Sequence, residues 1–206
     1  MILFIDTSTS YPIVSIIENN NIKAMFNKKI DTDISVSIFS ILDTMFKELN
    51  ITPKDIKKIF IANGPGSFTG TRIGVTIAKV YGYSLNVDLI PVSTLEVLAG
   101  GVNKDYIVPV IDARRGFVYA GIYDKDLNKI VDDRYISLDK LKEELEGKDY
   151  VFVSYDDIAG SIKPKINLIK VINKHEKDIP VNAHGLNPNY LKKTEAEEKL
   201  SDKKNN

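Results

Sequence analysis

The chain contains no cysteine, and this absence excludes several kinds of site at once. It can form no disulfide, no thiolate metal centre and no cysteine nucleophile. Histidine is also scarce, since His175 and His184 are the only 2, and they form no helical metal-binding pair. Neither lies near a recognisable serine nucleophile motif, so no Ser–His–Asp triad is indicated and we expect both to be solvated loop residues. We therefore predict no metal site and no catalytic residues.

The chain also lacks a net charge and a long apolar run. Its 28 basic residues balance 28 acidic ones, whereas a protein that holds nucleic acid alone usually carries a basic excess. If RNA is bound, we expect another subunit to hold most of it. No apolar run reaches the roughly 18 residues that cross a bilayer. An acid ends the opening "MILFID", where a signal peptide would still be apolar, so we expect a cytoplasmic globular protein without membrane contact.

What the sequence does contain is one order of elements, repeated. Short β-rich runs predict strands, and apolar residues at helical spacing predict helices. In the first half we predict strands at 2–6, 13–17, 22–27, 58–62 and 89–92, and helices at 35–49, 69–86 and 93–101. In the second half we predict strands at 106–112, 118–123, 129–136 and 150–154, and a helix at 137–147. Both halves run strand, strand, strand, helix, strand, and both first strands end in Ile-Asp.

This repeat predicts two related α/β lobes with a cleft between them and a shortened second lobe. The predicted domains are an N-terminal lobe at 1–102, a reduced C-terminal lobe at 103–191 and a charged tail at 192–206. The tail has few apolar anchors, which is typical of a frayed helix or a disordered segment, with partner binding as the alternative. "VIDARRGFVYAGIY" (110–123) is either an ordinary hairpin with solvated Arg114 and Arg115, or a cleft segment that places Asp112 across from Asp6.

The segment "NGPGSFTGTRIG" (63–74) raises the question of phosphate binding. It lacks the lysine of a Walker P-loop, and its glycine spacing departs from the Rossmann fingerprint. A hydrolase nucleophile elbow fails as well, because no glycines flank Ser67 at the required positions. Residues 64–67 instead suit a type II turn, with positive φ at Gly66 and a helix capped by Ser67 or Thr69. A purely structural turn, an anion held by free N–H groups and contact with a partner all stay open.

Small residues recur at every fourth position of the helix that follows. Glycine inside a helix costs about 1 kcal/mol relative to alanine, so its repetition requires a compensating contact. That contact is either a closely packed partner helix or the protein's own sheet. The helix at 35–49 adds an apolar arc wider than the roughly 100° that one core face requires. We therefore hypothesise an intersubunit helix bundle. Its predicted interface residues are Ile38, Leu42, Met45, Gly70, Gly74, Ala78, Tyr81 and Gly82.

Several segments together resemble the TsaB (YeaZ) family. They are "ILFIDTST" (2–9), "NGPGSFTGTRIG" (63–74), "PVSTLEVLA" (91–99), "VIDARRGFVYAGIY" (110–123) and "NPNYLKKTEAEEK" (187–199). They keep the family's order and span nearly the whole chain. The resemblance implies an α/β, actin/Hsp70-like (ASKHA, ribonuclease H-like) two-lobe fold with a reduced second lobe. It also implies a role in placing the threonylcarbamoyl group on the adenosine next to the tRNA anticodon.

For this chain the resemblance implies a non-catalytic subunit that scaffolds and activates a TsaD-type transferase, with a TsaE-type ATPase joining the complex. It implies a heterodimer through the two helices of the first lobe, with tRNA bound mainly by the complex. No cofactor of its own is expected, and ATP and a metal are expected in the partner subunits. The segments that match the family's cleft include Asp6, Gly64, Gly66, Ser67, Thr69 and Asp112.

In isolation we expect the same two helices to pair with a second copy, giving a homodimer. The rival hypothesis is an enzyme that acts alone, either an ATP-dependent phosphotransferase of the same fold or a peptidase. Calorimetric titration with ATP discriminates between the two hypotheses.

Overall fold

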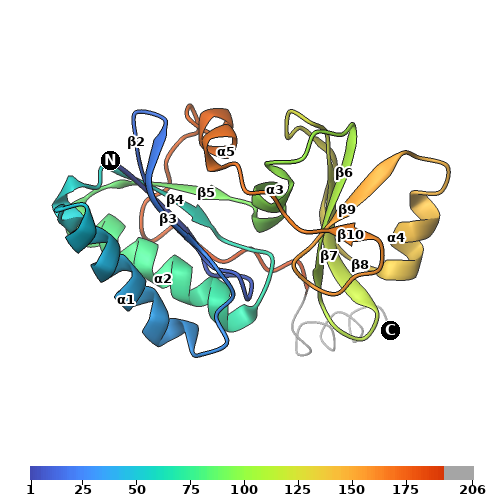
Figure 1. Ribbon diagram of the computed structural model, residues 1–206, viewed down its shortest axis with the longest axis horizontal. Coiled ribbons are helices and arrows are strands. Elements are labelled where there is room, and N and C mark those ends of the chain that lie inside the picture. The colour runs from blue at the N-terminus through green and yellow to red at the C-terminus, as the bar shows by residue number, and fades with distance from the viewer. Residues whose placement is uncertain (193–206) are drawn as a thin grey trace, which may run out of the picture.

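The computed structural model describes residues 1–192, which form two α/β lobes side by side (Figure 1). The predicted tail lies outside the described residues, apart from Lys192. The first lobe contains a five-stranded sheet in the order β3-β2-β1-β4-β5, in which β1, β4 and β5 run parallel and β2 and β3 are antiparallel. Its strands are β1 (Ile2–Asp6), β2 (Ile13–Glu18), β3 (Asn21–Asn27), β4 (Lys58–Ala62) and β5 (Asp88–Val92).

The second lobe repeats this sheet. Read from β8, its order is β8-β7-β6-β9-β10, with β6, β9 and β10 parallel and β7 and β8 antiparallel. Its strands are β6 (Tyr106–Asp112), β7 (Phe117–Tyr123), β8 (Lys129–Ser137), β9 (Tyr150–Val153) and β10 (Ser161–Ile162). The predicted repeat of element order is therefore confirmed, and it extends to a short fifth strand that the sequence did not predict.

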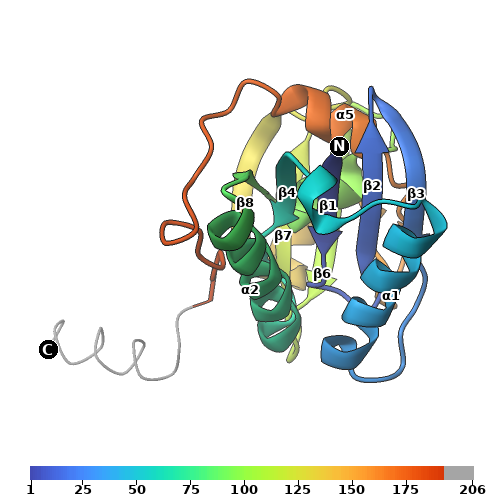
Figure 2. The ribbon, with the colours of Figure 1, turned by 90° about the vertical axis from the view of Figure 1, so that its left-hand side faces the viewer.

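The helices form layers around the two sheets (Figure 1). They are α1 (Ile34–Glu48), α2 (Phe68–Leu85), α3 (Thr94–Ala99), α4 (Leu138–Glu144) and α5 (Leu168–Lys174), with a 3-10 turn, η1, at Pro53–Asp55. In Figure 2, α1 and α2 lie side by side on the outer face of the first sheet. On the opposite side of that sheet, α3 and α5 pack in the core between the lobes, and α4 covers the outer face of the second sheet. None of the helices within residues 1–192 combines the length and apolar character of a membrane span.

One apolar core joins the lobes. It contains Phe4 and Phe60 of the first sheet, Leu95 of α3, Tyr123 of the second sheet and Leu168 of α5, all buried. Separate cores lie beneath α1 and α2 and beneath α4. Because burial of this apolar surface stabilises both lobes together, their relative position is part of the folded core.

After α5 the chain returns to the first lobe. The N–H of Val181 donates to the carbonyl of Leu89 at 2.9 Å, and the N–H of Asn189 donates to the carbonyl of Asn63 at 2.7 Å. Residues 180–192 thus form a strap over the first lobe, although the sequence assigned 180–191 to the second lobe and Lys192 to the tail. The domain boundary near residue 102 stays a prediction.

The loop before α2 differs from the predicted type II turn. Positive φ occurs at Gly64 (115°) and not at Gly66, and the Gly64–Pro65 peptide is cis. The type II turn was therefore wrong. Gly66 is required for another reason, because a Cβ there would lie 2.4 Å from the carbonyl oxygen of Ser8. The predicted Ser67 cap is confirmed, since its Oγ accepts the N–H of Gly70 at 3.3 Å.

The small-residue stripe of α2 packs against the protein's own sheet. A Cβ at Gly70 would lie 2.0 Å from the carbonyl oxygen of Thr7, and one at Gly74 would lie 2.5 Å from Thr7 Oγ1. Ala78 is fully buried, and a Cβ at Gly82 would meet a leucine of β5. The hypothesis that this stripe receives a partner helix is therefore wrong. Its small residues let α2 approach β1 closely.

The other predicted interface residues also face inward. Ile38, Leu42 and Met45 are buried in the core beneath α1, and Tyr81 is half-buried against the same core. Helical periodicity identified residues that share a face, and that face proved to be the one that packs on the sheet.

Candidate functional site

A cleft of about 500 Å³ lies between the lobes, beyond the carboxyl ends of β1 and β6. In open α/β sheets this is the usual place for ligand binding. Its wall on the first lobe is lined by Ser8, Thr9, Ser10, Gly66, Ser67, Phe68 and Thr69. Its wall on the second lobe is lined by Ile111, Asp112, Ala113, Arg114, Tyr119, Tyr155 and Asp156.

Most of the predicted cleft residues line this cleft, namely Gly66, Ser67, Thr69 and Asp112. Gly64 does not, because the strap covers it and a Cβ there would lie 2.9 Å from the carbonyl oxygen of Asn189. Asp6 lies beneath the cleft wall and is only 2% exposed. The expectation that Asp6 and Asp112 face each other across the cleft is therefore wrong for Asp6.

Hydroxyl groups surround the buried Asp6 carboxyl. Its Oδ1 accepts the N–H of Ser8 at 2.8 Å and the Ser8 hydroxyl at 2.5 Å. Ser8 Oγ also lies 2.8 Å from Thr94 Oγ1 at the start of α3. Burial raises the pKa of Asp6 to about 6, although the hydrogen bonds from Ser8 lower it. The carboxyl therefore links the first strand to α3 and does not reach a ligand.

On the opposite wall the polar groups organise the second lobe. The N–H of Asp112 donates to Asp156 Oδ2 at 2.8 Å, and Asp112 Oδ1 accepts the N–H of Arg114 at 2.8 Å. The Tyr155 ring stacks on Tyr11 of the first lobe, with centroids 4.2 Å apart. Sequence reasoning did not find this cross-lobe stack, since no local signal pairs two tyrosines so far apart along the chain.

The fold class implies a nucleotide with its magnesium in this cleft, and the lining residues do not fit one. The aspartate at the end of β1, Asp6, is buried and already hydrogen-bonded. Within residues 1–192 the charged side chains of the lining are Arg114, Asp112 and Asp156, which give an excess of negative charge. A polyphosphate would therefore meet like charge with few cations to offset it.

A second hollow lies on the outer side of the first lobe, between α1 and α2. This groove of about 340 Å³ is lined by Ser35, Phe39, Phe68, Thr69, Arg72, Ile73, Thr76 and Ile77. Two large apolar side chains that line it are exposed, namely Phe39 (59%) and Phe68 (52%). We call the exposed set the docking strip, which consists of Val36, Phe39, Phe68, Val80 and Tyr83. Exposed aromatic side chains that line a groove, as Phe39 and Phe68 do, are typical of an interaction site.

The strap reaches the edge of this groove. Arg72 Nε donates to the Tyr190 hydroxyl at 2.7 Å, and the guanidinium carbon lies 3.6 Å from the centroid of the Phe68 ring. This cation–π contact fixes Phe68 at the end of the groove. The sequence-based choice of interface residues named the buried side of α1 and α2, whereas the exposed aromatic side chains that line this groove were not among the predicted residues.

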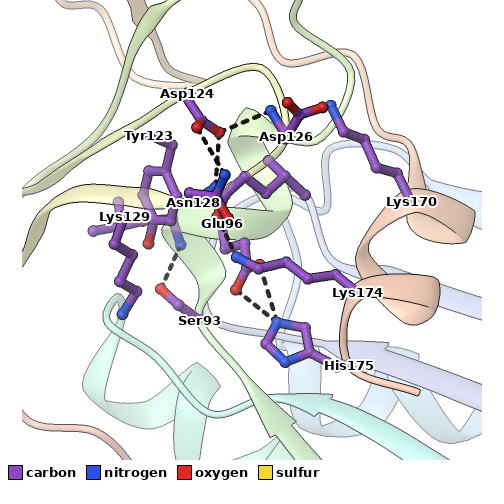
Figure 3. Close-up of polar contacts among 12 residues, drawn as sticks. Ser93, Glu96, Tyr123, Asp124, Asp126, Asn128, Lys129, Lys170, Lys174 and His175 are labelled. Carbon is purple, nitrogen blue, oxygen red and sulfur yellow. Dashed lines mark hydrogen bonds and ion pairs between the residues drawn. The ribbon is translucent and has the colours of Figure 1, made fainter. Parts of the chain in front are cut away.

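A buried charged cluster ties α5 to α3 (Figure 3). Glu96 Oε1 lies 2.8 Å from Lys174 Nζ, and Glu96 Oε2 lies 2.9 Å from His175 Nε2. His175 Nδ1 lies 2.6 Å from Asp178 Oδ2. Because both ring nitrogens face carboxylates, which only accept, both must carry hydrogen and the ring is an imidazolium. The prediction of a solvated His175 was therefore wrong, whereas His184 is exposed as expected.

The pKa shifts in this cluster follow from its hydrogen bonds. The hydrogen bond with Glu96 raises the pKa of His175, against the opposing effect of desolvation. Desolvation alone would raise the pKa of Glu96, but its hydrogen bonds to His175 and Lys174 outweigh that effect and lower it.

The repeated strand order, the central layer of α3 and α5 and the missing helix of the second lobe define an actin/Hsp70-like two-lobe α/β protein with a reduced second lobe. A solved structure titled "YeaZ from Pseudomonas aeruginosa" has this fold, with a TM-score of 0.79 at 18% identity over 92% of this chain and 99% of that one. The predicted fold class is therefore confirmed.

Sequence comparisons then narrow the class. The model of a family described as "TsaD: tRNA N6-adenosine threonylcarbamoyltransferase" matches residues 31–194. The "tRNA threonylcarbamoyladenosine biosynthesis protein TsaB" of Bacillus subtilis is 32% identical over 96% of both chains. The protein of the same name from Escherichia coli is 32% identical over 63% of this chain and 57% of its own. The chain belongs to the TsaB (YeaZ) family of tRNA threonylcarbamoyladenosine biosynthesis proteins.

Proposed function

We propose that this chain is a non-catalytic subunit required for threonylcarbamoylation of the adenosine next to the tRNA anticodon. It scaffolds and activates a TsaD-type transferase in a complex that a TsaE-type ATPase joins. Family membership supports the pathway. The docking strip on α1 and α2 is the single observation that carries the role of partner binding.

The docking strip has the composition of an interface core. Phe39 and Phe68 line the groove between α1 and α2, and aromatic side chains are the commonest anchors of protein interfaces. Arg72 stands at its edge, where interfaces are typically polar. A helix pair from the TsaD-type subunit would fill the groove and complete a helix bundle by ridges-into-grooves packing. Exposed on a lone chain, this surface is unfavourable in water.

The cleft supports the non-catalytic part of the proposal. Its excess of negative charge disfavours a polyphosphate, and Asp6 is buried away from a ligand, so ATP and the metal belong to the partner subunits in our proposal. Calorimetric titration of the isolated chain with ATP and magnesium tests this. Tight binding with turnover would instead favour an ATP-dependent phosphotransferase or a peptidase acting alone.

Reconstitution tests the docking role. Wild-type chain, Phe39→Arg and the matched control Ile179→Arg are each combined with the TsaD-type subunit, the TsaE-type subunit, ATP and unmodified tRNA. Phe39 and Ile179 are both exposed, but Ile179 lies outside the docking strip. We expect Phe39→Arg to abolish co-purification with the TsaD-type subunit and tRNA modification, because a charge buried without a partner is strongly unfavourable. Co-purification and tRNA modification should both remain at wild-type levels in Ile179→Arg.

Circular dichroism and thermal unfolding verify that Phe39→Arg is folded. Co-purification and modification at wild-type levels in this variant would contradict docking through the strip.

In the absence of the partner, we propose that the same strip pairs with a second copy. Light scattering should then report a homodimer for the wild type and a monomer for Phe39→Arg, and a monomeric wild type would contradict this proposal.

A further inference from the structure

The second lobe carries an aromatic cluster on the face that continues outward from the cleft. Phe117 and Tyr119 alternate along β7 and share this face, and Tyr135 of β8 pairs with Tyr119 in the sheet register. The rings of Phe117 and Tyr135 stack with centroids 4.7 Å apart, and Tyr119 tilts against Tyr135 at 5.8 Å. We call these three residues the aromatic face. Phe117 is 37% exposed, so the stack is open to a further planar group.

The turn before β7 places two arginines beside this face. Arg114 and Arg115 have φ of 68° and 56°, and Gly116 follows with φ of 77°. Glycine, asparagine and aspartate normally take such left-handed positions, and a long side chain there costs conformational energy. Arginine therefore occupies positions 114 and 115, although their backbone conformation favours a smaller residue.

Both arginines are exposed and available. Their guanidinium groups make no ion pair or hydrogen bond with the side chains of residues 1–192. The nearby Asp112 carboxylate accepts the backbone N–H of Arg114 and leaves its guanidinium free. Lys192, at the end of the strap, lies with Nζ 5.3 Å from the Tyr135 ring centroid. Lys192 thus lies against Tyr135, and the two arginines precede Phe117 in the turn that leads into β7.

We propose that the aromatic face and its arginines bind unpaired bases of RNA. Open aromatic rings accept bases of any sequence by stacking, and adjacent arginines pair with the phosphates that link those bases. The choice of RNA over another polyanion rests on the proposed function. The stacked aromatic rings indicate that unpaired bases are the part of the RNA that this face contacts. A neutral chain with one small cationic site holds RNA weakly, with Kd of about 10–100 µM.

Direct binding tests this inference without the partner subunits. Fluorescence anisotropy of the full chain is measured with a short RNA hairpin that has an unpaired loop and with a blunt duplex of the same stem. We expect the hairpin to bind about 10-fold more tightly than the duplex, because only the loop offers free bases to stack. Phe117→Ala should remove most of this preference, whereas Ile162→Ala, an exposed control on the far edge of the same sheet, should keep it.

A second variant reports on the arginines. The double variant Arg114→Ala/Arg115→Ala should lower the slope of log Kd against log salt by about 1.4, which corresponds to two phosphate contacts with single-stranded RNA. Equal binding of hairpin and duplex, or an unchanged hairpin Kd in Phe117→Ala, overturns the inference. It is also overturned if Phe117→Ala weakens co-purification with the TsaD-type subunit and leaves RNA binding intact. A chain that binds the hairpin but fails in reconstitution leaves this inference standing and contradicts the proposed function instead.

Discussion

The two lobes share one sheet topology but differ in the helix between the fourth and fifth strands. In the first lobe α2 connects β4 to β5, whereas residues 154–160 connect β9 to β10 in the second lobe without a helix. Consequently, among the described residues 1–192, two adjacent helices cover the outer face of the first sheet and α4 alone covers that of the second. The groove of the docking strip exists only where a second helix stands beside the first. The comparison teaches that the presence of one helix decides which lobe carries an apolar groove between two helices.

The ends of the first strands show a second difference between the lobes. Asp6 and Asp112 occupy equivalent places, as the last residues of β1 and β6. Asp6 is buried and hydrogen-bonded to Ser8, whereas Asp112 is exposed and caps the N–H of Arg114. Equivalent positions in the repeat thus have different surroundings, because Asp6 lies beneath the cleft wall whereas Asp112 lines the cleft.

The largest effect is expected from breaking the close approach of α2, the helix that only the first lobe has. Gly70→Ala would place a Cβ against the backbone carbonyl of Thr7, whose hydroxyl donates to the carbonyl of Gly70 at 2.6 Å. Because backbone atoms must move, we expect the free energy of unfolding to fall by about 3 kcal/mol or more. Urea denaturation measures this change.

Gly82→Ala is the matched control within the same helix. Its Cβ would meet the flexible end of the Leu89 side chain, and alanine favours the helix by about 1 kcal/mol. We expect this variant to be nearly neutral or more stable. An equal decrease in the free energy of unfolding in Gly70→Ala and Gly82→Ala would contradict a tight backbone contact between α2 and β1 at Gly70.

The next largest effect concerns the two aspartates. The folded-state pKa of Asp6 is about 6, above its ordinary value of 3.8, so the folded protein binds a proton that the unfolded chain has released. This lowers stability as pH rises from about 4 to 6, by about 3 kcal/mol at 1.36 kcal/mol per pH unit. Asp6→Asn should lack this loss, and Asp112→Asn should keep the wild-type profile. Denaturant midpoints across this pH range measure it, and identical profiles for wild type and Asp6→Asn would count against a buried neutral carboxyl.

Much of this comparison was visible in the sequence, because strands and long helices follow from local periodicity. The repeated order of elements and the end of both first strands at aspartate predicted the two lobes. The helix α5 was missed because "LIKVINK" is short and rich in β-branched residues, a pattern shared with strands.

The site was harder to predict because it depends on contacts between distant segments. The spacing of Gly70 and Gly74 shows that they share a face, but not that β1 lies against it. Likewise no local pattern joins His175 to Glu96, since these residues meet only when α5 packs on α3. The placement of Ser67 at the helix start was predictable, because capping is a local interaction.

A smaller effect is expected from the cluster that ties α5 to α3. The pKa of His175 is raised in the folded protein, so its contribution is fully present below the ordinary value of 6.5 and is lost as pH rises through the folded pKa. His175→Gln should lower the free energy of unfolding by about 2 kcal/mol at mildly acidic pH, with a smaller difference at alkaline pH. His184→Gln is the control, since His184 is exposed. A loss in His175→Gln that does not change with pH would contradict an imidazolium at this position.

The smallest effect concerns residue Tyr155, in the segment that replaces a helix in the second lobe. Its hydroxyl donates to Asn27 Oδ1 at 2.8 Å, and its ring stacks on Tyr11, so this segment contacts the first lobe across the cleft. Tyr155→Phe removes the hydrogen bond and keeps the stack, and we expect a loss of about 1 kcal/mol. Tyr155→Ala should lose a further amount of about 1 kcal/mol for the aromatic pair, beyond the burial of the ring. Urea denaturation measures both, and Tyr11→Phe serves as the control that preserves the stack and the Asn27 hydrogen bond. Tyr155→Phe could match wild type in its free energy of unfolding while Tyr155→Ala is destabilised. In that case stacking alone holds the lobes together at the cleft, and the hydrogen bond to Asn27 contributes nothing to stability.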